Sequence, residues 1–147
     1  MNLLILQPAE SAYAVLTDLS DQLFNAFSAL NRFQVVQYMP DKNKPPSETL
    51  HEVEQLINRH HISHVFGFNG VSMDLVVSSA HEDIQHIGWL VDYPVYHMAR
   101  LNAAMANKAI FSSNPNHAHY VSRMSNSTYV KAISLGTDFS DTDIPYP

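Results

Sequence analysis

The chain has 147 residues, of which 46% are hydrophobic and 10% aromatic, and its 8 basic and 14 acidic side chains give a net charge of −6. This length suits one domain with a sizeable core, and the apolar content excludes a disordered chain. No basic run is present, so nucleic acid and anionic membranes are not expected partners. The absence of cysteine excludes a disulfide framework and fits a cytoplasmic protein.

The amino-terminal run Met1-Asn2-Leu3-Leu4-Ile5-Leu6 is too short for a signal peptide, lacks a basic start and stops at Gln7-Pro8. It is typical of a buried β-strand instead. No later segment approaches the roughly 18 apolar residues of a transmembrane helix. We therefore expect no membrane-spanning segment.

Short apolar runs alternate with helical patterns along the whole chain. Strands are expected at residues 3–6, 33–38, 64–68, 87–91, 109–112 and 129–134. Helices are expected at 10–31 with a bend at 20–21, in a segment after 46 that Ser47 caps, near 72–81 and 96–106, and at 117–124. This alternation predicts an α/β fold, a Rossmann-like, doubly wound, mainly parallel sheet of about six strands with helices on both faces. The strands at 3–6 and 64–68 are expected to be central.

Most ligand motifs of this fold class are missing. The turn after the first strand lacks the glycines of a dinucleotide site, and neither a P-loop nor a G-x-S-x-G nucleophile turn is present. No cofactor is therefore expected. The nine histidines do not form a metal motif, because Gln55 stands where H-E-x-x-H would need its second histidine. No metal site is expected either.

The most informative segment runs from Trp89 to His97, where a buried strand leads into an acid, a proline and a histidine. Ligands of open α/β sheets bind beyond the carboxyl ends of the strands, which places Asp92, Tyr96 and His97 at such a rim. The alternative is a polar turn in which Asp92 caps the next helix and Pro94 sets its first turn.

A second polar loop, Asn69-Gly70-Val71-Ser72, follows the third strand. Gly70 permits a positive φ angle, Ser72 can cap the next helix, and the backbone N–H groups there could hold an anion or a sugar hydroxyl. An ordinary strand-to-helix turn explains these residues equally well. Gly136 and Asp138 form another turn after the last strand.

In this order, the segments resemble the N-terminal domain of bacterial GT-B glycosyltransferases, in the spore-maturation glycosyltransferase-like group. The resemblance covers roughly residues 62–139. It rests on four segments: His64-Val-Phe-Gly-Phe-Asn69-Gly70, Ile87-Gly-Trp89-Leu-Val-Asp92-Tyr-Pro94, Ala109-Ile-Phe111 and Ile133-Ser-Leu-Gly136-Thr-Asp138. Ser112-Ser113 stands where relatives often carry Asp-Arg, and Ser134-Leu135 replaces a proline before the glycine turn. Both departures concern acceptor details.

The resemblance implies that residues 1–140 form the acceptor-side domain and that residues 141–147 begin a linker to a second domain that binds a nucleotide-sugar donor. It implies transfer of a sugar to a cell-surface, protein or small-molecule acceptor. Asp92 or His97 would supply the base. The acceptor would be held by Asn69, Gly70, Ser72 and Tyr96, and the interdomain hinge would lie at Gly136 and Asp138. By itself this chain would bind acceptor and transfer nothing.

The competing hypothesis is a stand-alone, non-catalytic binding or interaction domain of flavodoxin-like architecture. A glycosyltransferase half leaves the rim around Asn69, Asp92 and Gly136 open toward a partner domain. A binding domain closes over its own ligand.

Overall fold

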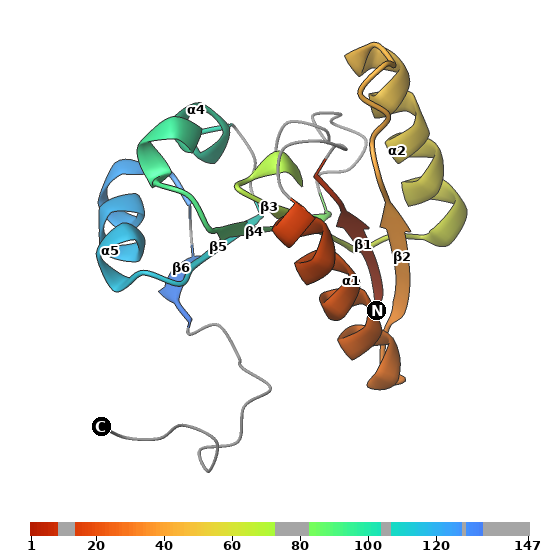
Figure 1. Ribbon diagram of the computed structural model, residues 1–147, viewed down its shortest axis with the longest axis horizontal. Coiled ribbons are helices and arrows are strands. Elements are labelled where there is room, and N and C mark those ends of the chain that lie inside the picture. The colour runs from red at the N-terminus through yellow and green to blue at the C-terminus, as the bar shows by residue number, and fades with distance from the viewer. Residues whose placement is uncertain (9–13, 73–82, 104–106, 128, 134–147) are drawn as a thin grey trace.

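The computed structural model describes residues 1–8, 14–72, 83–103, 107–127 and 129–133 (Figure 1). Its elements are β1 (Asn2–Leu6), α1 (Ala14–Ala29), β2 (Gln34–Tyr38), α2 (Pro46–His60), β3 (His64–Phe68), β4 (Gln85–Leu90), the short 3₁₀ helix η2 (Pro94–His97), α4 (Met98–Leu101), β5 (Lys108–Ser112), α5 (Pro115–Met124) and β6 (Tyr129–Ala132). No helix in these ranges is long and apolar enough to cross a membrane.

The six strands in the described part of the chain form one parallel sheet in the order β2-β1-β3-β4-β5-β6. The chain steps from β1 to β2 in one direction and then crosses to β3 on the other side of β1, so the strand order reverses between β1 and β3. Both β1 and β3 lie inside the sheet with a hydrogen-bonded neighbour on each edge. The expected α/β, Rossmann-like, doubly wound fold is confirmed.

Helices cover both faces of this sheet. Successive strand residues face opposite sides, so Ile5 packs under α1 beside the buried Leu16, whereas Leu4 packs against Val53 and Ile57 of α2. Figure 1 shows α1 and α2 on opposite sides of β1 and β2. Because β1 is buried on both faces, it appears in the sequence as a continuous apolar run, which is why it could be recognised as a strand.

A third apolar cluster joins β4 and β5 to α4 and α5. Its buried members are Leu90, Leu101, Ile110 and Val121. The parallel registers place Leu90 on the same face as Leu4, so α4 and α5 cover the α2 side of the sheet. Figure 1 shows these two helices together at the β5–β6 end of the molecule.

The buried amino group of Lys108, at the start of β5, binds the backbone at the end of α4. Its Nζ donates to the carbonyl oxygens of Leu101 (2.9 Å) and Ala103 (2.6 Å) and to the side-chain oxygen of Asn126. Burial lowers the pKa of this amino group. The three oxygens offset the cost of removing it from water. The lysine therefore fixes the far end of the segment that begins with His97.

Several element boundaries differ from those predicted. α2 begins at Pro46 after Pro45, which makes no side-chain cap, so the expected cap by Ser47 is wrong. Proline at the first helical position needs no N–H partner and starts the helix one residue earlier. β4 begins at Gln85 because that residue and the buried His86 pair with β3. The expected strand at 129–134 ends as β6 at Ala132.

The predicted helices also change. The helix expected at 10–31 is described from Ala14 to Ala29, and residues 9–13 lie outside the described residues. The expected helix at 96–106 is replaced by η2 and the four-residue α4. The helix expected at 117–124 begins two residues earlier, at Pro115. Apart from Ser72, the helix expected at 72–81 lies outside the described part, as do the hinge residues Gly136 and Asp138 and the segment 141–147.

Candidate functional site

A tight turn after β3 begins the candidate site. Asn69 and Gly70 have positive φ angles of 52° and 76°, which asparagine and glycine tolerate better than other residue types. The Asn69 N–H donates to the carbonyl oxygen of Trp89 over 2.9 Å and so extends the pairing of β3 with β4. The turn therefore directs the buried Asn69 side chain toward the chain that leaves β4.

The Asn69 side chain binds Asp92 directly. Its Nδ2 donates to Asp92 Oδ2 at 2.7 Å, and its Oδ1 accepts from the backbone N–H groups of Val91 (3.1 Å) and Asp92 (3.2 Å). The two residues are 23 positions apart in sequence and meet because β3 and β4 are neighbours with parallel carboxyl ends. Asn69 thus holds both the backbone and the carboxylate of Asp92.

Asp92 does not cap the following helix. The residue that precedes η2 is Tyr93, which makes no side-chain cap, while Pro94 occupies the first turn as the sequence indicated. The carboxylate of Asp92 is directed to Asn69 instead, so the helix-capping alternative is wrong for this residue.

His97, at the end of η2, is the third member of the site. Its Nε2 lies 3.6 Å from Asp92 Oδ2, and the two side chains form an ion pair when the imidazole is protonated. The side chain of His97 is 13% exposed and that of Asp92 is 43% exposed. A molecule arriving from solvent would therefore meet the carboxylate first, with the imidazole behind it.

Ser72 packs against β3. A Cβ on Gly67 would lie 2.8 Å from the Ser72 backbone nitrogen, so only glycine fits where this loop returns to the strand. The Ser72 hydroxyl is fully buried and makes no hydrogen bond to any described residue. The backbone is already helical at Val71 and Ser72, so Ser72 lies within the first turn, and the N–H groups that a Ser72 cap would bind lie outside the described residues.

Tyr96 and the hinge residues stand apart from this group. The side chain of Tyr96 is 81% exposed and its ring meets the Tyr93 ring edge-on, with centroids 6.3 Å apart. Gly136 and Asp138 lie outside the described residues. The structure thus brings together Asn69, Gly70, Asp92 and His97, and leaves Tyr96 on the surface next to them in sequence.

A pocket that sequence reasoning missed lies beyond the carboxyl ends of β4 and β5. It has a volume of about 380 Å³ and is lined by Tyr93, Pro94, Asn114, Asn116, His117 and Tyr120. It forms because α5 begins at Pro115, with the Asn114 side chain accepting a hydrogen bond from the Asn116 N–H over 2.9 Å. An asparagine followed by proline is a recognisable helix start, and this signal could have placed the helix correctly.

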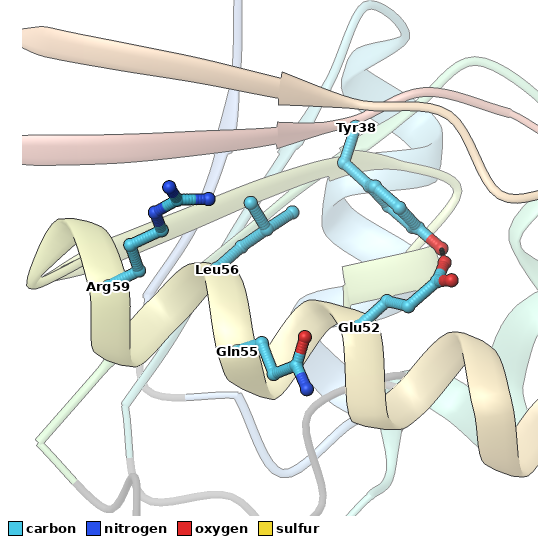
Figure 2. A pocket seen from close by; sticks show the side chains of 5 residues that line it. All are labelled: Tyr38, Glu52, Gln55, Leu56 and Arg59. Atoms are coloured by element: carbon cyan, nitrogen blue, oxygen red, sulfur yellow. Dashed lines mark hydrogen bonds between the residues drawn. The ribbon is translucent and has the colours of Figure 1, made fainter.

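A second pocket lies between β2 and α2 and has a different chemistry. It has a volume of about 260 Å³, and Figure 2 shows its lining residues Tyr38, Glu52, Gln55, Leu56 and Arg59. The Tyr38 hydroxyl points at Glu52 and donates to its carboxylate over 2.5 Å.

Glu52 is also bound by the Lys44 amino group. The Lys44 hydrogen bond lowers the pKa of Glu52, with the Tyr38 hydrogen bond as the second cause. Burial, followed by the hydrogen bond to Glu52, raises the pKa of Tyr38 to about 12. A neutral phenol and a neutralised carboxylate make this pocket a poor place for proton transfer at neutral pH.

Among the described residues, no three histidine, aspartate or glutamate side chains gather closely enough to hold a metal ion. His60 and His64, four apart in sequence, are separated by the change from α2 to β3. In comparisons with known proteins, the chain has no significant match to any family model, curated protein or solved structure.

Proposed function

We propose that this chain is the acceptor-side domain of a glycosyltransferase and that Asp92 is its general base. The observation that carries this assignment is the hydrogen-bonded placement of Asp92 by Asn69 at the carboxyl edge of the sheet, with His97 3.6 Å away. Further support comes from the resemblance of the Trp89–Pro94 segment to the W-x-x-D-x-P segment of GT-B acceptor domains.

The reaction requires a base beside the acceptor hydroxyl. The hydroxyl gives its proton to a carboxylate oxygen of Asp92 while its oxygen bonds to the anomeric carbon of the donor sugar. The bond from that carbon to the nucleotide diphosphate breaks, and the diphosphate departs with the electron pair. The half-exposed carboxylate suits proton acceptance, and the mostly covered His97 acts as a positioning residue that keeps Asp92 oriented.

The donor is assigned to a second domain. A diphosphate needs a glycine-rich loop or a cluster of positive charge, and the turn after β1 has no glycine. The net charge of −6 also repels a nucleotide diphosphate. Chemistry then takes place in the cleft between the domains, above Asp92.

Two measurements test this function. Calorimetry of the 147-residue chain with UDP-glucose, GDP-mannose and dTDP-rhamnose should detect no tight binding, whereas binding in the micromolar range would contradict a separate donor domain. A protein that contains this chain together with the proposed donor domain, called the joined protein below, should transfer sugar from one of these donors to an acceptor extracted from cells. Absence of product with all nucleotide sugars would overturn the proposed function.

A non-catalytic binding domain is the second candidate. The pocket between Tyr93 and Tyr120, called the Tyr93 pocket below, favours it, because described residues of this chain alone form that pocket. The same transfer assay separates the two candidates. A binding domain retains its ligand and gives no product in any combination of donor and acceptor.

A further inference from the structure

The Tyr93 pocket, lined by the six residues named above, has the size and position of a small-ligand site. Its volume of about 380 Å³ falls near the lower end of the range for small-molecule sites. One wall follows β4 and the other follows β5, so the pocket opens at the edge of the sheet where ligands of this fold class bind.

Aromatic rings supply much of the apolar lining. Tyr93 is 54% exposed, and its ring stands perpendicular to the His117 ring, with centroids 5.0 Å apart and an interplanar angle of 89°. Edge contacts with His117 and with Tyr96 orient the Tyr93 ring, which is still about half exposed. Tyr120 and the buried Pro94 complete the apolar lining.

The polar groups of the pocket are amides, hydroxyls and the imidazole of His117. The Asn114 side-chain oxygen is engaged by the Asn116 N–H, which leaves the Asn114 Nδ2 group able to donate to a ligand. The exposed Asn116 amide and the two tyrosine hydroxyls can each donate and accept. Among the described residues, no aspartate, glutamate, lysine or arginine lines the pocket.

We propose that this pocket binds the ring of a neutral sugar. A pyranose has C–H groups that pack on aromatic rings and hydroxyl groups around its rim that need both donors and acceptors, and the pocket offers both. Phosphate and carboxylate ligands are disfavoured because lysine and arginine are absent from the lining. An extended apolar ligand is disfavoured because it would leave the two asparagine amides without partners.

The pocket also gives the proposed reaction a substrate class. Tyr93 directly follows Asp92 in the segment that leaves β4, so the pocket and the proposed base lie at the same carboxyl edge of the sheet, although the Asp92 side chain is directed toward Asn69 and not into the pocket. The acceptor is then itself a sugar or a glycan. This last step rests on the proposed function, whereas sugar binding rests on the pocket alone.

The test is a heteronuclear NMR titration of the 147-residue chain with the methyl glycosides of glucose, galactose and N-acetylglucosamine. We expect saturable shifts in the side-chain amide signals of Asn114 and Asn116 for at least one glycoside, with a dissociation constant on the order of 1–10 mM. Tyr93→Ala should weaken that binding about tenfold by removing the packing surface. Because Tyr93 is largely exposed, this change should leave the fold intact.

The matched control is a pair of histidines on α5. His117→Ala should weaken binding, since His117 lines the pocket, and His119→Ala should not, since His119 is exposed and lies outside it. Absence of shifts with all three glycosides would overturn the proposal. Displacement of a bound glycoside by inorganic phosphate at Asn114 and Asn116 would also overturn it, in favour of an anion site.

The two proposals can fail separately. Glycoside binding without sugar transfer by the joined protein would retain the sugar pocket and remove the transferase function. Transfer to an acceptor that contains no sugar, with no glycoside shift, would do the reverse.

Discussion

Glu52 and Asp92 both lie near the carboxyl edge of the sheet, and the two carboxylates differ in what surrounds them. Glu52 receives a neutral donor, the Tyr38 hydroxyl, and a cation, Lys44. Asp92 also receives a neutral donor, the Asn69 amide, but the basic group beside it is the His97 imidazole at 3.6 Å. A carboxylate neutralised by lysine is committed to structure. Asp92 has no lysine or arginine bound to it among the described residues and is held by an amide, which is why it, and not Glu52, is the proposed base.

The largest contrast is expected in catalysis. Asp92→Asn should lower the rate of sugar transfer about 10²–10⁴-fold, because losing a positioned base typically has that effect. Glu52→Gln should leave the rate unchanged. The measurement is the initial rate of transfer by the joined protein, with circular dichroism to show that both variants fold. Equal losses for the two variants would remove the distinction between the sites.

Stability should show a second contrast. Asn69→Ala leaves the N–H groups of Val91 and Asp92 without their acceptor and forces alanine to a positive φ, so it should lower the free energy of unfolding by about 2–4 kcal/mol. Asn43→Ala, at an exposed asparagine bonded to Asp41, should change it by less than about 0.5 kcal/mol. Urea denaturation measures both. A loss under about 1 kcal/mol for Asn69→Ala would show that Asn69 does not hold the site together.

The contact of Gly67 with Ser72 provides a smaller test of the same region. Gly67→Ala would place a Cβ 2.8 Å from the Ser72 backbone nitrogen, and a backbone atom cannot move away cheaply. We expect a loss of about 1–3 kcal/mol, as for overpacked cores, with altered NMR signals for Asn69 and Asp92. Unchanged signals would mean that the turn adapts without disturbing the site.

The sheet was predictable because its central strands are buried on both faces and therefore appear as apolar runs. The predicted strands at 87–91 and 109–112 begin later than the observed β4 and β5, because the first residues of both strands are polar. His86 and Lys108 are buried, and Lys108 is satisfied by Asn126 and by carbonyl oxygens after α4. Hydrogen-bond partners that are distant in sequence decide whether such residues can be buried, and a local sequence pattern does not show those partners.

The candidate site was predictable to a similar extent. Parallel topology alone indicated that Asn69, Asp92 and His97 share one edge. It could not indicate that Asn69 accepts from two backbone N–H groups, since that depends on the positive φ at Asn69 and on the exact register of β3 with β4. The Tyr93 pocket was missed because the predicted helix began at residue 117, whereas α5 begins at Pro115 and so brings Asn116 into the pocket lining.

The smallest effect is expected at Tyr38, in the structural cluster. The pKa of Tyr38 is about 12 in the folded protein, above its ordinary value of 10.0, so the fold favours the protonated phenol. A raised pKa contributes stability that is fully present below pH 10 and is lost as the pH rises through 12. The difference in urea midpoint between the natural chain and Tyr38→Phe should therefore be constant up to about pH 10 and shrink above it. Glu52→Gln should lower the pKa of Tyr38 without restoring it to 10, because burial is the larger cause. If Glu52→Gln leaves the pKa of Tyr38 unchanged, Glu52 does not bind Tyr38 as described, and the contrast between Glu52 and Asp92 is lost.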